Sequence, residues 1–328
     1  MSVPRRARSA RRCRPARSGR LNGRRDGPMI VCLAAALGSS TLARRADGQG
    51  REQRRYGSGA PEAKLMLYYS STLAFSPLGS SSVVERGPVA DGGARRRMVR
   101  AEASVELSYV PPLSAEQRTT VSDKPESTNL APLFARPRLA LRLPAGIGLE
   151  TGWIPPVRVF DVRANLIAAA VSRSFSPTPR TRIVPRASFL SGRVEGAITC
   201  NRETARNRGA ALATYFAFVC HGNNSRDFFE PGHVSAELLL SRLFAGGRWE
   251  PYLSGGARGE RTRFDIGVIG SDGKRDSDNP VLEVRSTRGY GTAGASWRGA
   301  RRTRLAAEVY YAPGSAVTVR ALAGIGLW

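Results

Sequence analysis

Two cysteines and two histidines lie close together in one long polar stretch and are the first candidates for chemistry. Cys200 and Cys220 are the only cysteines beyond residue 43, and His221 and His233 follow them. In an oxidising compartment an even pair of cysteines favours a disulfide. The alternative is a metal site made of all four side chains, but adjacent Cys220 and His221 lack the usual two-residue ligand spacing. We therefore predict a disulfide, with no metal ion and no cofactor.

Histidine and aspartate residues in the polar stretches of the chain could form an acid–base pair for hydrolysis. They are His221, Asp227, His233, Asp276 and Asp278. General acid–base catalysis requires such groups to converge on one substrate atom. Their spacing follows no hydrolase motif, and no Gly-x-Ser-x-Gly nucleophile elbow with a supporting acid and base is present. We expect that the chain is not an enzyme, and keep a hydrolase as a distant alternative.

Between about 99 and 328, polar residues recur at every second position of many stretches, and arginine and glutamate are frequent among them. Apolar residues occupy the positions between them. This alternation defines ten stretches. Successive side chains of a strand point to opposite faces, so each stretch predicts a strand with one apolar and one charged face. The charged faces would line an interior, with these candidates: Arg100, Glu102, Glu106, Arg138, Arg142, Glu150, Arg163, Arg182, Arg186, Glu237, Arg258, Glu260, Arg304 and Glu308.

The connectors between these strands alternate in length. Long polar connectors cover 111–132, 193–232 and 268–280, whereas 144–146, 245–248 and 298–301 are tight turns. Transmembrane β-barrels have this layout, with short periplasmic turns and longer outer loops. The fold class that we predict is all-β: an antiparallel up-and-down transmembrane barrel over 99–328, with about ten strands and eight or twelve as alternatives.

Aromatic residues cluster near the strand ends, where the two membrane interfaces of a barrel lie. The residues expected in these two girdles are Tyr109, Trp153, Phe244, Trp249, Trp297, Tyr311 and Trp328. Core aromatics of a soluble sheet would have no reason to gather at turns. The pattern favours a membrane protein.

The N-terminal region reads as an export signal followed by a linker. Residues 1–43 combine ten arginines, a short apolar run and a small residue before the cut, as in a cleaved signal peptide. Residues 44–62 are rich in Gly and Arg and predict a flexible leader. Over 63–98 we expect a short helix and a linker; the helix, starting near Pro61, would pack against or plug the barrel.

The net charge of +25 raises the question of nucleic-acid binding. Such binding needs a clustered basic patch with aromatic residues that stack on bases. Here the arginines are spread over many strands and interleaved with glutamate, and the signal peptide would remove the chain from the cytoplasm. We expect no nucleic-acid partner.

The last strand ends on the aromatic residue Trp328. A terminal aromatic after an alternating strand resembles the C-terminal assembly signal of bacterial outer-membrane β-barrel proteins. The resemblance covers 99–328 and is architectural. It implies outer-membrane lipid and the barrel assembly machinery as partners, and we expect a monomer. It departs from the family pattern in one respect, because Trp328 shares its face with Arg320 rather than with Leu327.

The expected strand number limits the function. Side chains nearly fill an eight-stranded barrel, so ten strands leave at most a narrow pore. The candidate interior residues include slightly more arginine than glutamate, which favours small anionic solutes if the pore is open. A closed interior of paired charges gives a structural role instead. The alternative function is surface binding or adhesion through the disulfide-closed 193–232 loop. The distant enzymatic alternative has a parallel in the omptin surface proteases, which also have ten strands.

Overall fold

The structure is a computed structural model that describes residues 53–79, 99–120, 126, 128, 132–159, 161–202, 220–244, 246, 248–276, 279–299, 302–314 and 316–327. The predicted signal peptide (1–43), the first part of the leader (44–52), the 80–98 linker and Trp328 lie outside these residues. None of the helices within them has the length and apolar character needed to cross a membrane.

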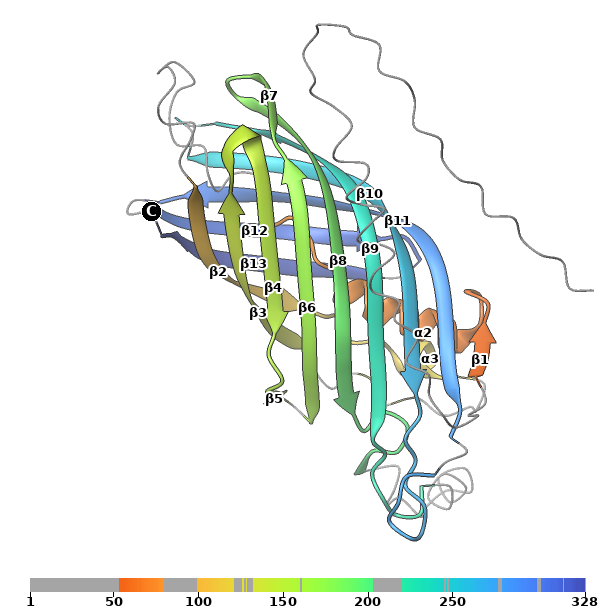
Figure 1. Ribbon diagram of the computed structural model, residues 1–328. Coiled ribbons are helices and arrows are strands. Elements are labelled where there is room, and N and C mark those ends of the chain that lie inside the picture. Colours follow the sequence, from red (N-terminus) through yellow and green to blue (C-terminus); the bar gives the residue numbers. More distant parts are fainter. Residues whose placement is uncertain are drawn as a thin grey trace, which may run out of the picture. The chain divides into compact units, whose positions relative to one another are not determined.

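Ten antiparallel strands form a closed barrel (Figure 1). Their bounds are β2 Arg100–Tyr109, β3 Leu133–Arg142, β4 Ile147–Ile154, β6 Val162–Arg173, β8 Thr181–Gly196, β9 Asp227–Arg242, β10 Trp249–Asp265, β11 Val281–Arg298, β12 Thr303–Ala312 and β13 Ala316–Gly326. Each strand pairs with the next in this series, and the pairing of β13 with β2 closes the ring. The predicted fold class and strand number are confirmed.

Three short strands and three helical segments complete the structure. Strands β5 (Arg158–Val159) and β7 (Phe175–Thr178) pair antiparallel with β6 and β8, and β1 (Gln53–Tyr56) pairs in parallel with the start of β11. The helices are α2 (Pro61–Thr72), the single turn α3 (Ala115–Arg118) and the 3-10 turn η3 (Pro144–Gly146). These elements leave the ring of ten strands intact.

The alternation of side chains explains why the sheet closes with its apolar face outward. Val105, Leu107, Leu238, Leu253 and Val319 are all about half exposed on the outer surface. Their strand neighbours, such as Glu106 and Arg320, are completely buried inside. A soluble protein rarely exposes so many large apolar side chains together, whereas a barrel in lipid requires them.

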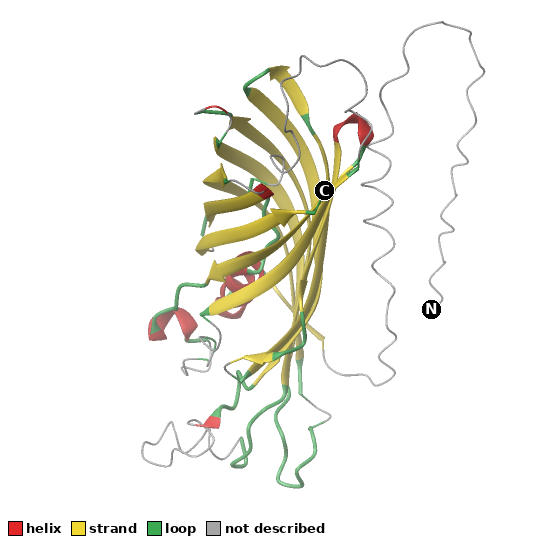
Figure 2. Ribbon diagram, turned by 90° about the vertical axis from the view of Figure 1, so that its left-hand side faces the viewer, coloured by secondary structure: helices red, strands yellow, loops and turns green. Residues whose placement is uncertain are grey.

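The two ends of the barrel differ. One end, which we name the turn end, carries the connections at 143–146, 174–180, 243–248 and 299–302. The other, the loop end, carries longer connections, including 197–226 and 266–280. Strand β8 extends to Gly196 and strand β9 begins at Asp227. The connecting loop therefore covers 197–226 and is shorter than the predicted 193–232. Figure 2 shows loops projecting beyond the strands.

Helix α2 lies inside the barrel and runs from the loop end inward. Ala63, Met66 and Leu67 pack against Phe229, Leu282 and Val284 near the loop ends of β9 and β11. At the other end of the segment, Leu78 packs against Ala306 and Leu322, and Gly79 approaches Tyr252, Arg304 and Ser296 near the turn ends of their strands. The chain from Pro61 to Gly79 therefore traverses the lumen, and we name residues 61–79 the plug segment (Figures 1 and 2).

Candidate functional site: the lumen and the plug segment

The lumen contains a ladder of arginine–glutamate pairs. The Glu106 carboxylate forms salt bridges with Arg136 at 3.3 Å and with Arg138 at 3.0 Å. Arg138 also forms a salt bridge with Glu150 at 2.7 Å. Arg186 bridges Glu150 and Glu237 on the neighbouring wall. These side chains are nearly or fully buried, where an unpaired charge would be costly. The ladder therefore joins β2, β3, β4, β8 and β9 across the interior.

The same arginines bind the plug segment through its main chain. Arg136 donates to the carbonyl oxygen of Leu73 at 2.7 Å, and Arg320 donates to that of Ala74 at 2.7 Å. Further bonds run from Arg138 and Arg186 to Ser76, from Arg186 to Phe75, from Arg320 to Thr72, and from Arg304 to Leu78. Five arginines thus bind six carbonyl groups of residues 72–78. The first of these carbonyls end helix α2, whose C-terminus carries a partial negative charge.

Phe75 anchors the plug segment among the guanidinium groups. The guanidinium carbons of Arg138, Arg186 and Arg136 lie 4.3, 5.0 and 5.4 Å from its ring centroid, distances at which a cation is attracted to a ring. The ring also packs against Ala168, Ala170 and Leu190. Phe75 therefore joins the cationic and the apolar parts of the lumen wall.

Two further contacts attach the plug segment to the opposite wall. The Leu78 backbone N–H donates to Glu308 Oε2 at 3.0 Å, an oxygen that also accepts from the Tyr252 hydroxyl. Arg258 donates to Ser71 Oγ and to the Tyr310 hydroxyl, both at 2.7 Å. The plug segment is therefore bound to this wall at Ser71 and at Leu78.

The buried charges that face the lumen are balanced. Among the described residues they are seven arginines and seven glutamates: Arg136, Arg138, Arg182, Arg186, Arg258, Arg304, Arg320, Glu102, Glu106, Glu150, Glu237, Glu250, Glu260 and Glu308. Most of them pair within the wall, for example Arg304 with Glu102 and Arg182 with Glu250. The slight arginine excess expected from the sequence is not found among these buried groups.

Most of the expected interior residues are part of this ladder. Arg100 and Arg142 are opposite each other near the turn end and are only partly buried. The prediction that Arg163 faces the interior is wrong, because Arg163 is exposed and donates a hydrogen bond to the Pro156 carbonyl. It shares its face with Asn165, whose side-chain oxygen accepts a hydrogen bond from the exposed Trp153. Strand β6 turns Leu166, Ala168 and Ala170 inward instead. Ala168 and Ala170 pack there against Phe75.

The list of expected interior residues omitted three buried charges. Arg136, Glu250 and Arg320 each lie on the inner face of a predicted strand. Their alternation with outward apolar residues was a sufficient signal. The contacts of Arg136 and Arg320 with the plug segment had no signal in the sequence, because the partners are main-chain carbonyls.

The expected girdle aromatics lie at the strand ends. Phe244 and Trp249 form an isolated bridge at the turn end, and Trp249 is opposite Trp297. Tyr109, Trp153 and Tyr311 are exposed near the loop end. This arrangement matches two interfaces of a membrane.

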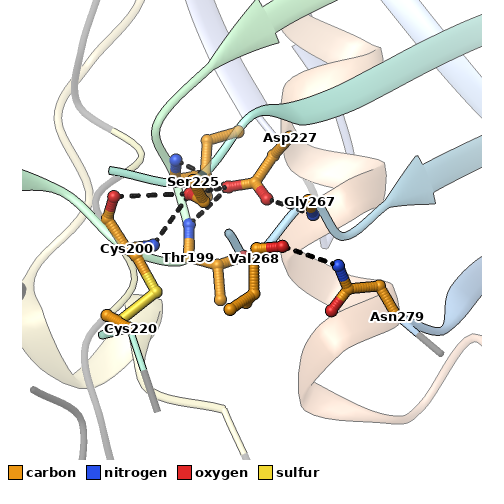
Figure 3. The surroundings of a disulfide bond; sticks show 9 residues. Thr199, Cys200, Cys220, Ser225, Asp227, Gly267, Val268 and Asn279 are labelled. Atoms are coloured by element: carbon orange, nitrogen blue, oxygen red, sulfur yellow. Dashed lines mark hydrogen bonds between the residues drawn. A yellow bond between two sulfur atoms is a disulfide. The ribbon is translucent and has the colours of Figure 1, made fainter. Parts of the chain in front are cut away.

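Cys200 and Cys220 form a disulfide beyond the loop end (Figure 3), with Val268 packed against it. Beside it, the buried carboxylate of Asp227 accepts four hydrogen bonds, from the backbone of Ile198, Thr199 and Gly267 and from Ser225 Oγ, at 2.6–2.8 Å. Asp227 thereby ties the 197–226 loop to the 266–280 loop.

The residues considered for hydrolysis do not form one site. The Asp227 carboxylate is occupied by backbone donors, His233 is buried in the lumen, and His221 is exposed in the loop. Asp278 lies outside the described residues. Within the described part of the chain, no three His, Cys, Asp or Glu residues are grouped so as to hold a metal ion.

Comparisons with known proteins give no family assignment. No family model matches the chain, and no curated protein matches it. Solved structures align weakly: the attachment invasion locus protein Ail of Yersinia pestis (9% identity, TM-score 0.25, 70% of this chain and 94% of Ail), the Pseudomonas putida toluene transporter TodX (10%, 0.29, 84% and 77%) and the KdgM porin (11%, 0.24, 68% and 98%). At these scores the matches carry no information on role.

Proposed function

We propose that this protein is a bacterial outer-membrane β-barrel that is closed at rest by its own residues 61–79. In this proposal small solutes pass only when the plug segment leaves the lumen. The signal peptide at 1–43 would deliver the chain, and the loop end would face outward. The observation that carries the proposal is the set of bonds from five lumen arginines to the main chain of residues 72–78.

The pairing of the wall supports a plug that can be displaced. A buried ion that loses its partner costs about 3–5 kcal/mol. Most lumen arginines contact a wall glutamate in addition to the plug segment, as Arg304 does with Glu102 at 2.9 Å. The bonds to the plug segment involve neutral carbonyls, which water can replace. Departure of the segment would therefore leave the charge ladder intact.

The balance of the lumen charges bears on selectivity. Seven arginines face seven glutamates among the buried wall groups that the structure describes. A pore with balanced walls discriminates weakly between anions and cations, since selectivity follows the net field of the lining residues. We therefore expect small solutes of either charge rather than the anions favoured by the sequence.

The test is conductance in a planar bilayer of the refolded full chain and of a variant lacking residues 46–98. Each sample must first show heat-modifiable gel migration, which reports a folded barrel. We expect a silent full-length protein and stable conducting steps from the deletion variant. Equal conductance of the two folded proteins would contradict the proposal.

A surface-binding role is the second candidate, and one observation favours it. Asp227 joins the bases of the 197–226 and 266–280 loops, and the disulfide closes the first of these loops on itself. Binding residues often lie on loops that a rigid scaffold positions. Cells that express a variant without residues 203–219 should then lose adhesion, while the barrel stays folded. Unchanged adhesion would exclude this role for the loop.

A further inference from the structure

Two neighbouring strands carry a tryptophan pair at one end and an arginine pair at the other. In the pairing of β10 with β11, Trp249 is opposite Trp297, and Arg261 is opposite Arg285. In each strand the two residues are twelve positions apart. At roughly 3.3 Å per residue and a tilt of about 40°, twelve residues span roughly 30 Å along the membrane normal, close to the height of a barrel's apolar band.

The surface between the two pairs carries no charge. The outward positions of β10 are Pro251, Leu253, Gly255, Ala257 and Gly259, and those of β11 are Thr287, Gly289, Gly291, Ala293 and Ala295. If the tryptophans mark one interface, the arginine pair lies at the headgroup level of the other. This placement assumes that the barrel is inserted in the membrane, as in the proposed function.

The arginine pair belongs to a basic cluster that has too few acids to neutralise it. Like charges directly opposite each other in a sheet are destabilising. One buried carboxylate serves both: Glu283 Oε2 contacts Arg261 at 3.0 Å, and Oε1 contacts Arg285 at 2.7 Å. Arg263 and Arg55 are each opposite Glu283 on the adjoining strands. Nearby, Glu230 pairs with Arg193, and Asp265 pairs with Arg275.

The guanidinium groups remain available to a ligand from the membrane side. The Arg261 and Arg285 side chains are 46% and 59% exposed, although both contact Glu283. Guanidinium groups bind phosphate with short, charge-assisted and often bidentate hydrogen bonds. We propose that Arg55, Arg261, Arg263 and Arg285, the rim cluster, bind the phosphate groups of lipid headgroups in the leaflet at the loop end.

The test is a titration of the refolded full chain in detergent with fluorescent diphosphoryl lipid A and with the same lipid after removal of its phosphates. The variant R261Q/R285Q should bind the phosphorylated lipid at least about tenfold more weakly, since two charge-assisted contacts are lost. The matched variant R242Q/R248Q, which changes two exposed arginines at the turn end, should bind as the wild type does. Equal loss in both variants, or equal binding of the dephosphorylated lipid by the wild type, would overturn the proposal.

A second variant separates binding from a structural role. Glu283→Gln releases both guanidinium groups, so it should bind phosphorylated lipid A at least as tightly as the wild type. A loss as large as that of R261Q/R285Q would mean that the cluster only holds β10 to β11, and would overturn the proposal. Inorganic phosphate that displaced lipid A completely would reassign the cluster to a free anion. Heat-modifiable migration of every variant keeps failure here distinct from failure of the barrel itself.

Discussion

The guanidinium carbon of Arg138 lies 4.3 Å from the ring centroid of Phe75, in the middle of the lumen. Arg138 belongs to the barrel wall and Phe75 to the plug segment, and they are far apart in the chain. The same guanidinium pairs with Glu106 and Glu150, so one side chain serves both the wall and the plug. Contacts of this kind hold the plug segment inside the folded barrel.

Replacement of the anchoring ring should loosen the plug segment. Phe75→Ala removes a 97% buried aromatic side chain and its three guanidinium contacts. We expect the free energy of unfolding to fall by about 3–5 kcal/mol, as for other buried Phe→Ala changes. Urea unfolding in detergent measures this. The control is Phe175→Ala at an exposed position, expected to change stability by about 0.5 kcal/mol or less; equal effects would argue against the anchor.

Removal of one ladder carboxylate should cost more than removal of a surface one. Glu106→Gln leaves Arg136 and Arg138 short of a buried partner, which costs about 3–5 kcal/mol. Glu230→Gln breaks an exposed pair with Arg193 and should cost about 1 kcal/mol or less. The two melting curves, recorded in the same detergent, compare the costs directly. Similar losses would mean that the ladder is not a buried network.

The path of the plug segment predicts where the preceding residues emerge. Ser58 is exposed and precedes the loop-end part of α2, so Ser58→Cys should react with a membrane-impermeant maleimide on intact cells. Lys274→Cys at the loop end should react as well, whereas Ala145→Cys at the turn end should react only after permeabilisation. Protection of position 58 in cells where position 274 is labelled would show that the segment enters from the other side.

The Asp227 contacts should control the loops and leave the barrel unchanged. Asp227→Ala removes the acceptor for three backbone N–H groups, and each unsatisfied buried donor costs about 1–3 kcal/mol. The change should raise amide hydrogen exchange in 197–202 and 266–270 without affecting β2 or β3. Removal of the disulfide in C200S/C220S should lower the free energy of unfolding by about 3 kcal/mol on the chain-entropy model, and it should affect the same loops. Exchange that rose equally in all strands would contradict a local role.

The barrel was predictable because its physical signal is local. Alternating side chains, tight turns and terminal aromatics each follow from the two-residue period of a strand, and they identified ten strands and most inner faces. The helix that starts at Pro61 and the pairing of Cys200 with Cys220 also have local signals. These features required no knowledge of what fills the interior.

The contacts between the plug segment and the wall were not predictable from the sequence, because they join residues that are far apart in the chain. In β6 both faces are largely apolar, so the choice between Ile167 and Ala168 as the inward residue depends on Phe75, a residue distant in the chain. Bonds from arginine to main-chain carbonyls leave no pattern in residue types. The prediction that Arg163 faces the interior is therefore wrong, whereas the alternation alone is enough to place Arg136 and Arg320 inward.

The most direct measurement of the central claim is a crosslink between the plug segment and the wall. Leu78 and Ala306 share a buried cluster, so L78C/A306C in a C200S/C220S background should form a disulfide between positions 78 and 306 in the folded barrel. Mass spectrometry of the crosslinked peptide, lost on reduction, is the predicted result. A folded barrel in which position 78 reacts freely with maleimide and no crosslink forms would contradict closure of the lumen by residues 61–79.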